Sequence, residues 1–264
     1  MKTGFIALLS DFGTNDPFVA TMKGVILSKT PQTQIIDITH KIPPQDIITG
    51  AFYLMSCMSY MPKKTLFLCV VDPSVGMGRG IIWAKTKNYQ FICPDNGIIS
   101  WVEEIEPIEE SRFINNSRLF LKKISSTFHG RDIMAPVAAE IAKGFLEKNI
   151  GPIFKEYRKN PFPRQTKTGN RILGKVIAID NFGNVITSID QKYIRAKSIF
   201  TISEKTIKGL KLTYASVDEG ADLALIGSFG FVEFSVRGGS FAKNHDIKIG
   251  QKVEAIISLD EDYI

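Results

Sequence analysis

The sequence contains 264 residues, of which 44% are hydrophobic and 23% are charged, and its net charge is +6 at neutral pH. These values are typical of a soluble globular protein and argue against a disordered or membrane-embedded chain. The length fits one large domain or two smaller ones. Residues 5–9 form an apolar run that is too short for a signal peptide or a membrane span, so we expect a cytoplasmic protein with no membrane partner.

Neither the lysines nor the cysteines form a recognisable binding pattern. The lysines are scattered, and no basic stripe alternates with aromatic residues, so we expect no nucleic-acid partner. An anionic small ligand or plain solubility explains the charge equally well. Cys57, Cys69 and Cys93 lie in apolar surroundings without C-x-x-C spacing, which predicts reduced, buried thiols and neither disulfides nor a zinc site.

The first part of the chain alternates short apolar runs with helical patterns. Apolar runs predict strands at residues 5–9, 34–38, 66–71, 81–84 and 89–92, and helical spacing predicts helices at 18–27, 47–61 and from about 136 onward. This alternation favours a Rossmann-like α/β domain, which we place at residues 1–160. In open α/β sheets, ligands bind at the carboxyl ends of the strands.

Polar loops follow most of these predicted strands. They are Ser10-Asp11-Phe12-Gly13, Asp37-Ile38-Thr39-His40, Val71-Asp72-Pro73-Ser74-Val75-Gly76 and Pro94-Asp95-Asn96-Gly97. Asp11-Phe12-Gly13 also spells the kinase metal-binding tripeptide, but only ten residues precede it and leave no room for a kinase glycine loop. The segment 72–79 lacks a complete phosphate-loop pattern. The sequence leaves open whether Asp11 and Asp95 bind a ligand or only form turns.

A further polar stretch, residues 125–132, runs into the last helical pattern. His129, Arg131 and Asp132 therefore crowd at a helix entrance, where free N–H groups and partial positive charge favour ligands. The alternative is that His129 and Asp132 only cap the helix.

The pattern changes in the last third of the chain. Prolines and basic residues between 155 and 170 indicate a linker, which we place at residues 161–170. Short runs at 172–179, 185–189, 223–226, 231–236 and 252–257 predict an all-β sandwich or barrel domain over residues 171–264. The segments 180–184 and 228–231 are predicted turns that either bind a ligand or only connect strands.

The order of the motifs is similar to that of a known family. The polar loops above, Thr127-Phe128-His129-Gly130-Arg131-Asp132 and Phe182-Gly183-Asn184 together resemble the S-adenosyl-L-methionine (SAM) hydroxide adenosyltransferase family, which is related to fluorinase and chlorinase. The resemblance covers residues 5–257. It implies a homotrimer with an N-terminal α/β domain and a C-terminal β-barrel, binding SAM where domains of neighbouring subunits meet. Water, activated as hydroxide, would displace L-methionine from C5′ and yield adenosine, with no cofactor and no metal.

The resemblance also implies roles for individual residues. Asp72, Arg79 and His129 match the catalytic set of the hydrolytic branch. The expected substrate contacts are Asp11 to the ribose hydroxyls, Asp180 to the methionine end, and Asn184 and Ser228 to the adenine. This sequence departs from the pattern at Arg237, where an Asn is usual, and at Phe229, where relatives vary.

The chemistry of the residues agrees with this assignment. A sulfonium releases a neutral thioether, so the demand on the enzyme is to form hydroxide near neutral pH, which an arginine stabilises and an aspartate or histidine assists. Two other functions remain open. One is a metal-dependent phosphohydrolase using Asp11, Asp72, Asp95 and His129. The other is a non-catalytic module that binds adenosine or SAM.

Overall fold

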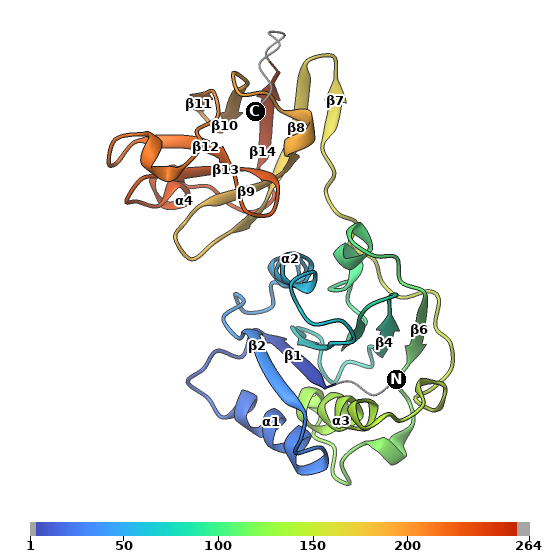
Figure 1. Cartoon of the computed structure of the whole chain (residues 1–264). Helices are drawn as coiled ribbons and strands as arrows, with labels where there is room; N and C mark the ends of the chain where they lie inside the picture. The colour runs from blue at the N-terminus through green and yellow to red at the C-terminus, as the bar shows by residue number, and fades with distance from the viewer. Residues whose placement is uncertain (1–3, 258–264) are drawn as a thin grey trace. The chain divides into compact units, whose positions relative to one another are not determined.

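The protein consists of two compact units, seen in a computed structural model that describes residues 4–257 (Figure 1). The N-terminal unit spans Met1–Phe162 and the C-terminal unit spans Pro163–Ile264. The stretch predicted as a linker, residues 161–170, contains the short strand β7 (Thr166–Thr168). Within the described residues, no helix is long and apolar enough to cross a membrane.

The N-terminal unit is a mixed α/β fold around a six-stranded sheet of order β2-β1-β3-β5-β4-β6. Its strands are β1 (Phe5–Ser10), β2 (Gln34–Thr39), β3 (Leu66–Val70), β4 (Ile81–Lys85), β5 (Gln90–Pro94) and β6 (Glu110–Phe113). The first three strands and β5 run parallel, whereas β4 and β6 pair antiparallel at one edge. The α/β class and five of these strands are as predicted, and β6 was not predicted.

Helices cover both faces of this sheet (Figure 1). They are α1 (Phe18–Lys29), α2 (Ile47–Met58) and α3 (Ala135–Lys143). Alternate residues of β1 point to opposite faces: Ile6 and Leu8 pack in the core that contains α1 and α3, and Ala7 and Leu9 in the core that contains α2. Burial on both faces explains why these strands are continuous apolar runs.

The parallel strands bring the polar loops to one edge. Because β1, β3 and β5 are parallel neighbours, their carboxyl ends lie side by side. The segments that carry Asp11, Asp72 and Asp95 all begin at these ends. The three polar loops therefore lie along one edge of the sheet, which is the edge where the sequence predicts a ligand.

The C-terminal unit is an antiparallel, nearly closed barrel of order β11-β10-β14-β8-β9-β13-β12, with β7 paired to β8. Its other strands are β8 (Arg171–Ile179), β9 (Val185–Asp190), β10 (Ile199–Ile202), β11 (Lys205–Lys208), β12 (Asp222–Ile226), β13 (Phe231–Val236) and β14 (Lys252–Ile256), and α4 is Phe241–Asn244. A bridge between Leu210 and Ala224 joins the two ends of the sheet. The all-β class is as predicted, although β7, β10 and β11 were missed.

Short helical turns complete both units. They are Ser100–Glu104, Ser117–Leu119, Gly130–Met134, Glu147–Asn149, Gln191–Tyr193 and Tyr214–Ser216.

Candidate active site

The first feature of the candidate site is a buried ion pair in the loop after β3. Arg79 donates from Nε to Oδ1 of Asp72 at 2.5 Å and from Nη2 to Oδ2, and its Nη1 donates to the Gly80 carbonyl at 2.7 Å. The two side chains are only 8% and 6% exposed. Burial lowers the pKa of the Arg79 guanidinium to about 10, while the nearby Asp95 carboxylate opposes that shift. Arg79 therefore stays cationic at neutral pH.

Glycine brings this loop against the segment that carries His129. Gly76 has a φ of +79°, and a Cβ at this position would lie 2.5 Å from the Ser126 carbonyl oxygen. A side chain is excluded both by conformation and by space. The backbone of the Asp72–Arg79 loop therefore packs directly against the backbone of Ser126.

His129 stands at the entrance of a π-helical turn, Gly130–Met134, that continues into α3. Pro136 lacks an N–H, so it cannot bond the carbonyl of Asp132 as a regular helix would require. That carbonyl instead accepts from the backbone N–H of Leu121 at 2.9 Å. The predicted helix entrance is confirmed, and the π-turn is an added feature of the kind that recurs at functional sites.

Neighbouring groups set the charge state of His129. Burial lowers its pKa below the ordinary value of 6.5, the Arg79 charge lowers it further, and the Asp132 carboxylate works in the opposite direction. The imidazole is therefore neutral at physiological pH and is able to accept a proton. Asp72, Arg79 and His129 thus lie in one electrostatic neighbourhood.

Arg131 and Asp132 support the loop around His129. Arg131 donates to both carboxylate oxygens of the fully buried Asp132 at 2.6 and 3.0 Å, and the Ser125 N–H donates to it at 2.7 Å. Burial alone would raise the pKa of Asp132, but these hydrogen bonds hold it below its ordinary value. Asp132 closes the 125–132 loop on itself.

Asp11, at the end of β1, is held by a strained residue. Its Oδ2 accepts the backbone N–H of Gln45 at 2.8 Å, and Gln45 has a φ of +67°, an uncommon conformation for a residue with a side chain. Next to it, His40 bridges Ser10 at 2.8 Å and Asp37 at 3.1 Å. Ser10 and His40 are buried, so this Ser-His-Asp series fixes the loop.

Asp95 lies in the polar segment after β5, and its hydrogen bonds join that segment to other parts of the unit. Its backbone N–H donates to the Gly80 carbonyl at 2.9 Å, and its Oδ1 accepts the N–H of Arg158 at 2.7 Å. The segment is joined to the loop after β3, because Asn96 donates from Nδ2 to the Val71 carbonyl at 2.7 Å.

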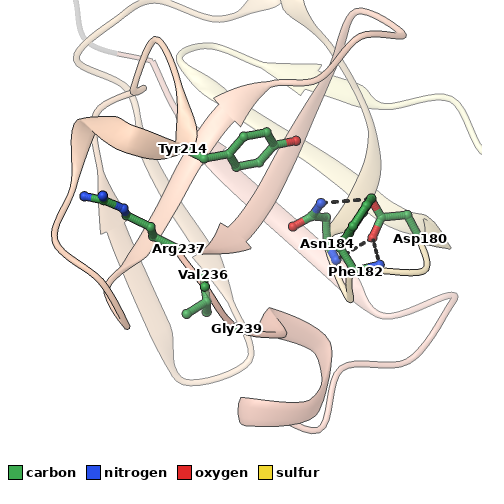
Figure 2. A pocket seen from close by; sticks show the side chains of 8 residues that line it. Asp180, Phe182, Asn184, Tyr214, Val236, Arg237 and Gly239 are labelled. Carbon is green, nitrogen blue, oxygen red and sulfur yellow. Dashed lines mark hydrogen bonds between the residues drawn. The ribbon is translucent and has the colours of Figure 1, made fainter.

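The C-terminal unit contains a pocket of about 600 Å³ (Figure 2). Its lining residues come from the β8–β9 turn, the Tyr214 turn and the end of β13, and they are Asp180, Phe182, Asn184, Tyr214, Val236, Arg237, Gly238 and Gly239. Two of the predicted substrate residues, Asp180 and Asn184, lie here together. Ser228 is an exposed residue of the β12–β13 turn and is not among these eight described lining residues.

Asp180 organises the β8–β9 turn with its carboxylate. Its Oδ1 accepts the backbone N–H groups of Phe182 and Asn184, both at 2.9 Å, and its Oδ2 accepts from the Asn184 side chain at 2.8 Å. Gly183, with a φ of +84°, has no room for a Cβ because Ser240 lies against it. The predicted hairpin turn is confirmed, with a carboxylate and an amide held at the pocket edge.

Sequence reasoning missed two residues of this region, Tyr214 and Glu233. Glu233 lies in β13 and is only 6% exposed. The signal that could have found it is a lone carboxylate inside the apolar run Phe231–Val236.

Within residues 4–257, no three His, Cys, Asp or Glu side chains form a cluster able to hold a metal ion. The acidic residues at the ends of β1, β3 and β5 instead accept hydrogen bonds from Gln45, Arg79 and Arg158.

Comparisons with known families match both units. The SAM hydroxide adenosyltransferase N-terminal domain matches residues 6–151, and the C-terminal domain of the same family matches residues 174–254. The chain is also similar to a conserved protein of Thermotoga maritima, whose crystal structure superposes with a TM-score of 0.89 at 33% identity, covering 95% of this chain and 99% of that one.

Relatives of known activity have similar lengths. The (R)-S-adenosyl-L-methionine hydrolase of Thermus thermophilus is 31% identical, covering 95% of this chain and 99% of its own. The enzyme of the same name from Methanocaldococcus jannaschii is 35% identical over 87% of each chain. The fluorinase of Nocardia brasiliensis is 27% identical, covering 94% of this chain and 95% of its own. The chain belongs to the SAM hydroxide adenosyltransferase family.

Proposed function

We propose that this protein hydrolyses SAM to adenosine and L-methionine. The observation that carries the proposal is the buried Asp72–Arg79 pair, whose loop packs against the segment that leads to His129. The Arg79 charge lowers the pKa of His129. Relatives in the same family are named for hydrolysis of this substrate, and their similarity extends over both units.

In the proposed reaction, the oxygen of water attacks C5′ of the ribose. The C5′–S bond breaks, its electron pair goes to sulfur, and methionine leaves as a neutral thioether that needs no acid. The water must lose one proton. We assign that proton to His129, because its lowered pKa leaves it neutral and able to accept a proton, whereas the Asp72 carboxylate is paired with the Arg79 cation.

Arg79 stabilises the developing hydroxide in this mechanism. Three of its N–H groups are committed to Asp72 and Gly80, which fixes the position of the guanidinium. A cation held rigidly in a poorly hydrated site stabilises an anion without first having to reorient. Asp72 is the residue that holds this charge in place.

The substrate contacts follow from the charge of each part of SAM. Asp11 has one carboxylate oxygen bonded to Gln45 and presents the other to the ribose hydroxyls. Asp180 suits the ammonium group of the methionine end, since each carboxylate oxygen accepts more than one hydrogen bond. Asn184 and Ser228 are assigned to the adenine.

The names of the relatives specify the R form of the substrate. A sulfonium that carries three different groups is a stereocentre, so two forms exist at sulfur. We propose that this chain prefers the R form, which would give hydrolysis a use in removing one configuration of the substrate.

We further propose a cytoplasmic homotrimer whose N-terminal unit is Rossmann-like, with the ligand at the carboxyl ends of its parallel strands. Sedimentation equilibrium tests the trimer: a mass of one or two chains contradicts it.

To test the function, the protein is incubated separately with the R and S sulfonium forms of SAM. The products are then separated by chromatography and identified by mass. Equal amounts of adenosine and methionine, formed faster from the R form, support the proposal. Parallel reactions with chloride or fluoride test for halogenation. Formation of a 5′-halogenated nucleoside would show that the protein is a halogenase and would contradict the proposed hydrolysis. Tight binding of SAM with no product over a long incubation would support a binding module instead.

A further inference from the structure

The C-terminal unit buries a carboxyl group that the proposed reaction does not use. Glu233 is the third residue of β13 and is only 6% exposed, in a strand whose other residues are mostly apolar. Burial raises its pKa above the ordinary value, and the Asp180 carboxylate at the pocket edge adds to that effect. Burying a carboxyl group is unfavourable unless other groups form hydrogen bonds with it.

The hydrogen-bond partners of Glu233 connect this residue to the pocket. Oε1 of Glu233 accepts from the Tyr214 hydroxyl at 2.7 Å and from the Ser235 hydroxyl at 3.0 Å. The carboxyl also lies close to the β12–β13 turn, where a Cβ on Gly227 would be 2.6 Å from Oε2. Of these two donors, only Tyr214 lines the pocket.

Tyr214 begins a short helical turn on an exposed segment. Residues 211–216 are all exposed, and Tyr214 itself is 46% exposed. Figure 2 shows its ring extending between Arg237 and Asn184. The hydrogen bond to Glu233 ties this ring to a buried strand. Without the bond, the ring would be an exposed aromatic side chain free to change rotamer.

We propose that Glu233 is a positioning residue that holds the Tyr214 ring as an aromatic wall of the pocket, against which a nucleobase of the substrate packs. The identity of that base rests on the proposed function. A flat ring binds another flat ring best when its orientation is fixed in advance. Glu233 supplies that orientation through the phenol hydroxyl, which explains a tyrosine here in place of a phenylalanine.

The test compares variants that lose the Tyr214–Glu233 hydrogen bond. Tyr214→Phe keeps the ring and removes the hydroxyl, and Glu233→Leu removes the acceptor. Each should raise KM for SAM and the dissociation constant for adenosine by about tenfold, the scale of one hydrogen bond, with little change in kcat. The double variant should be no worse than either single variant, because both remove the same contact.

Two further variants separate positioning from stability. Glu233→Gln retains an oxygen that accepts from Tyr214, so it should restore KM to within about twofold of the original protein. Ser235→Ala removes the second hydrogen bond to Oε1 but no pocket-lining group, and should leave KM unchanged. Thermal unfolding of each variant shows whether it is folded.

Measuring adenosine binding by calorimetry tests the positioning role of Glu233 independently of SAM hydrolysis. If SAM is not turned over but Tyr214→Phe still weakens adenosine binding, the function fails and the positioning role stands. Turnover with unchanged KM and adenosine affinity in Tyr214→Phe would overturn the positioning role. Absence of adenosine binding by the unmodified protein would also overturn it.

Discussion

Arg79 donates to both carboxylate oxygens of Asp72, and each of these side chains is more than nine-tenths buried. The pair sits in the loop after β3, beside the segment that ends at His129. A buried ion pair of this kind is a weak source of net stability, but breaking it leaves a charge without compensation. Its presence at the candidate site is therefore best explained by a requirement for a fixed cation.

Replacing one member of the Asp72–Arg79 pair should lower both the stability of the protein and its turnover. Asp72→Asn should lower the free energy of unfolding by about 3–5 kcal/mol, because the Arg79 charge is left buried without its partner. Turnover should fall as well, since the guanidinium is no longer held. Urea titration and initial rates measure the two effects.

The control for this prediction is an exposed pair in the same unit. Lys159 and Glu103 are 2.9 Å apart with side chains 56% and 31% exposed, so Lys159→Ala should change stability by no more than about 1 kcal/mol. If Asp72→Asn were as mild as Lys159→Ala, the Asp72–Arg79 pair would not be a buried, coupled unit.

The charge state of His129 predicts the pH dependence of turnover. Its pKa lies below 6.5, and the proposed base must be neutral, so kcat should fall as pH drops through this lowered value. From neutral pH upward, kcat should stay flat until Arg79, with a pKa of about 10, begins to lose its charge. His129→Gln should reduce kcat by about 10² to 10⁴-fold and remove the acid limb.

A second histidine provides the control for the pH profile. His245 is hydrogen-bonded to Asp222 at 2.9 Å and packs against Phe241, outside the proposed machinery. His245→Gln should keep the acid limb of the profile. An acid limb that survives in His129→Gln would assign the titration to another group.

Asp180 should contribute both to stability and to binding. Asp180→Ala removes three hydrogen bonds within the β8–β9 turn and should cost about 1–3 kcal/mol, together with an increase in KM for SAM. Asp190→Ala removes a comparable turn contact, to the Lys192 N–H at 2.9 Å, at a residue that does not line the pocket. It should lower stability by about 1 kcal/mol without changing KM. Equal KM effects in the two variants would argue against a binding role for Asp180.

Removal of metal ions should not affect the reaction. The carboxylates at the proposed site accept hydrogen bonds from protein groups, and the mechanism assigns no step to a metal. Turnover should therefore be unchanged after dialysis against a chelator. Loss of activity that magnesium or manganese restores would favour the metal-dependent phosphohydrolase.

The sequence predicted the elements that are buried on both faces. Strands β1 and β3 are continuous apolar runs because helices cover both sides of the sheet, and such runs are readily recognised. The strand β6 consists of three polar residues and one phenylalanine at the sheet edge, so its sequence carries neither an apolar run nor an alternating pattern. Strands β10 and β11 are equally short.

The hydrogen bonds that join separate segments of the fold could not be predicted from the sequence. The motifs led to Asp72, Arg79 and His129 as candidates, but the bonding of Arg79 to both oxygens of Asp72 depends on the path of the intervening loop. The π-turn after His129 depends on Leu121 reaching the carbonyl of Asp132, a contact with no sequence pattern. The catalytic and binding roles of these residues stay predictions.

The most direct test of the proposed chemistry follows the oxygen atom of water. The protein is incubated with SAM in water enriched in ¹⁸O, and the adenosine is fragmented in a mass spectrometer. Attack of water at C5′ predicts one ¹⁸O atom per adenosine, located at the 5′-hydroxyl, and unlabelled methionine. Adenosine without the label at C5′, or no adenosine at all, would contradict hydrolysis by activated water.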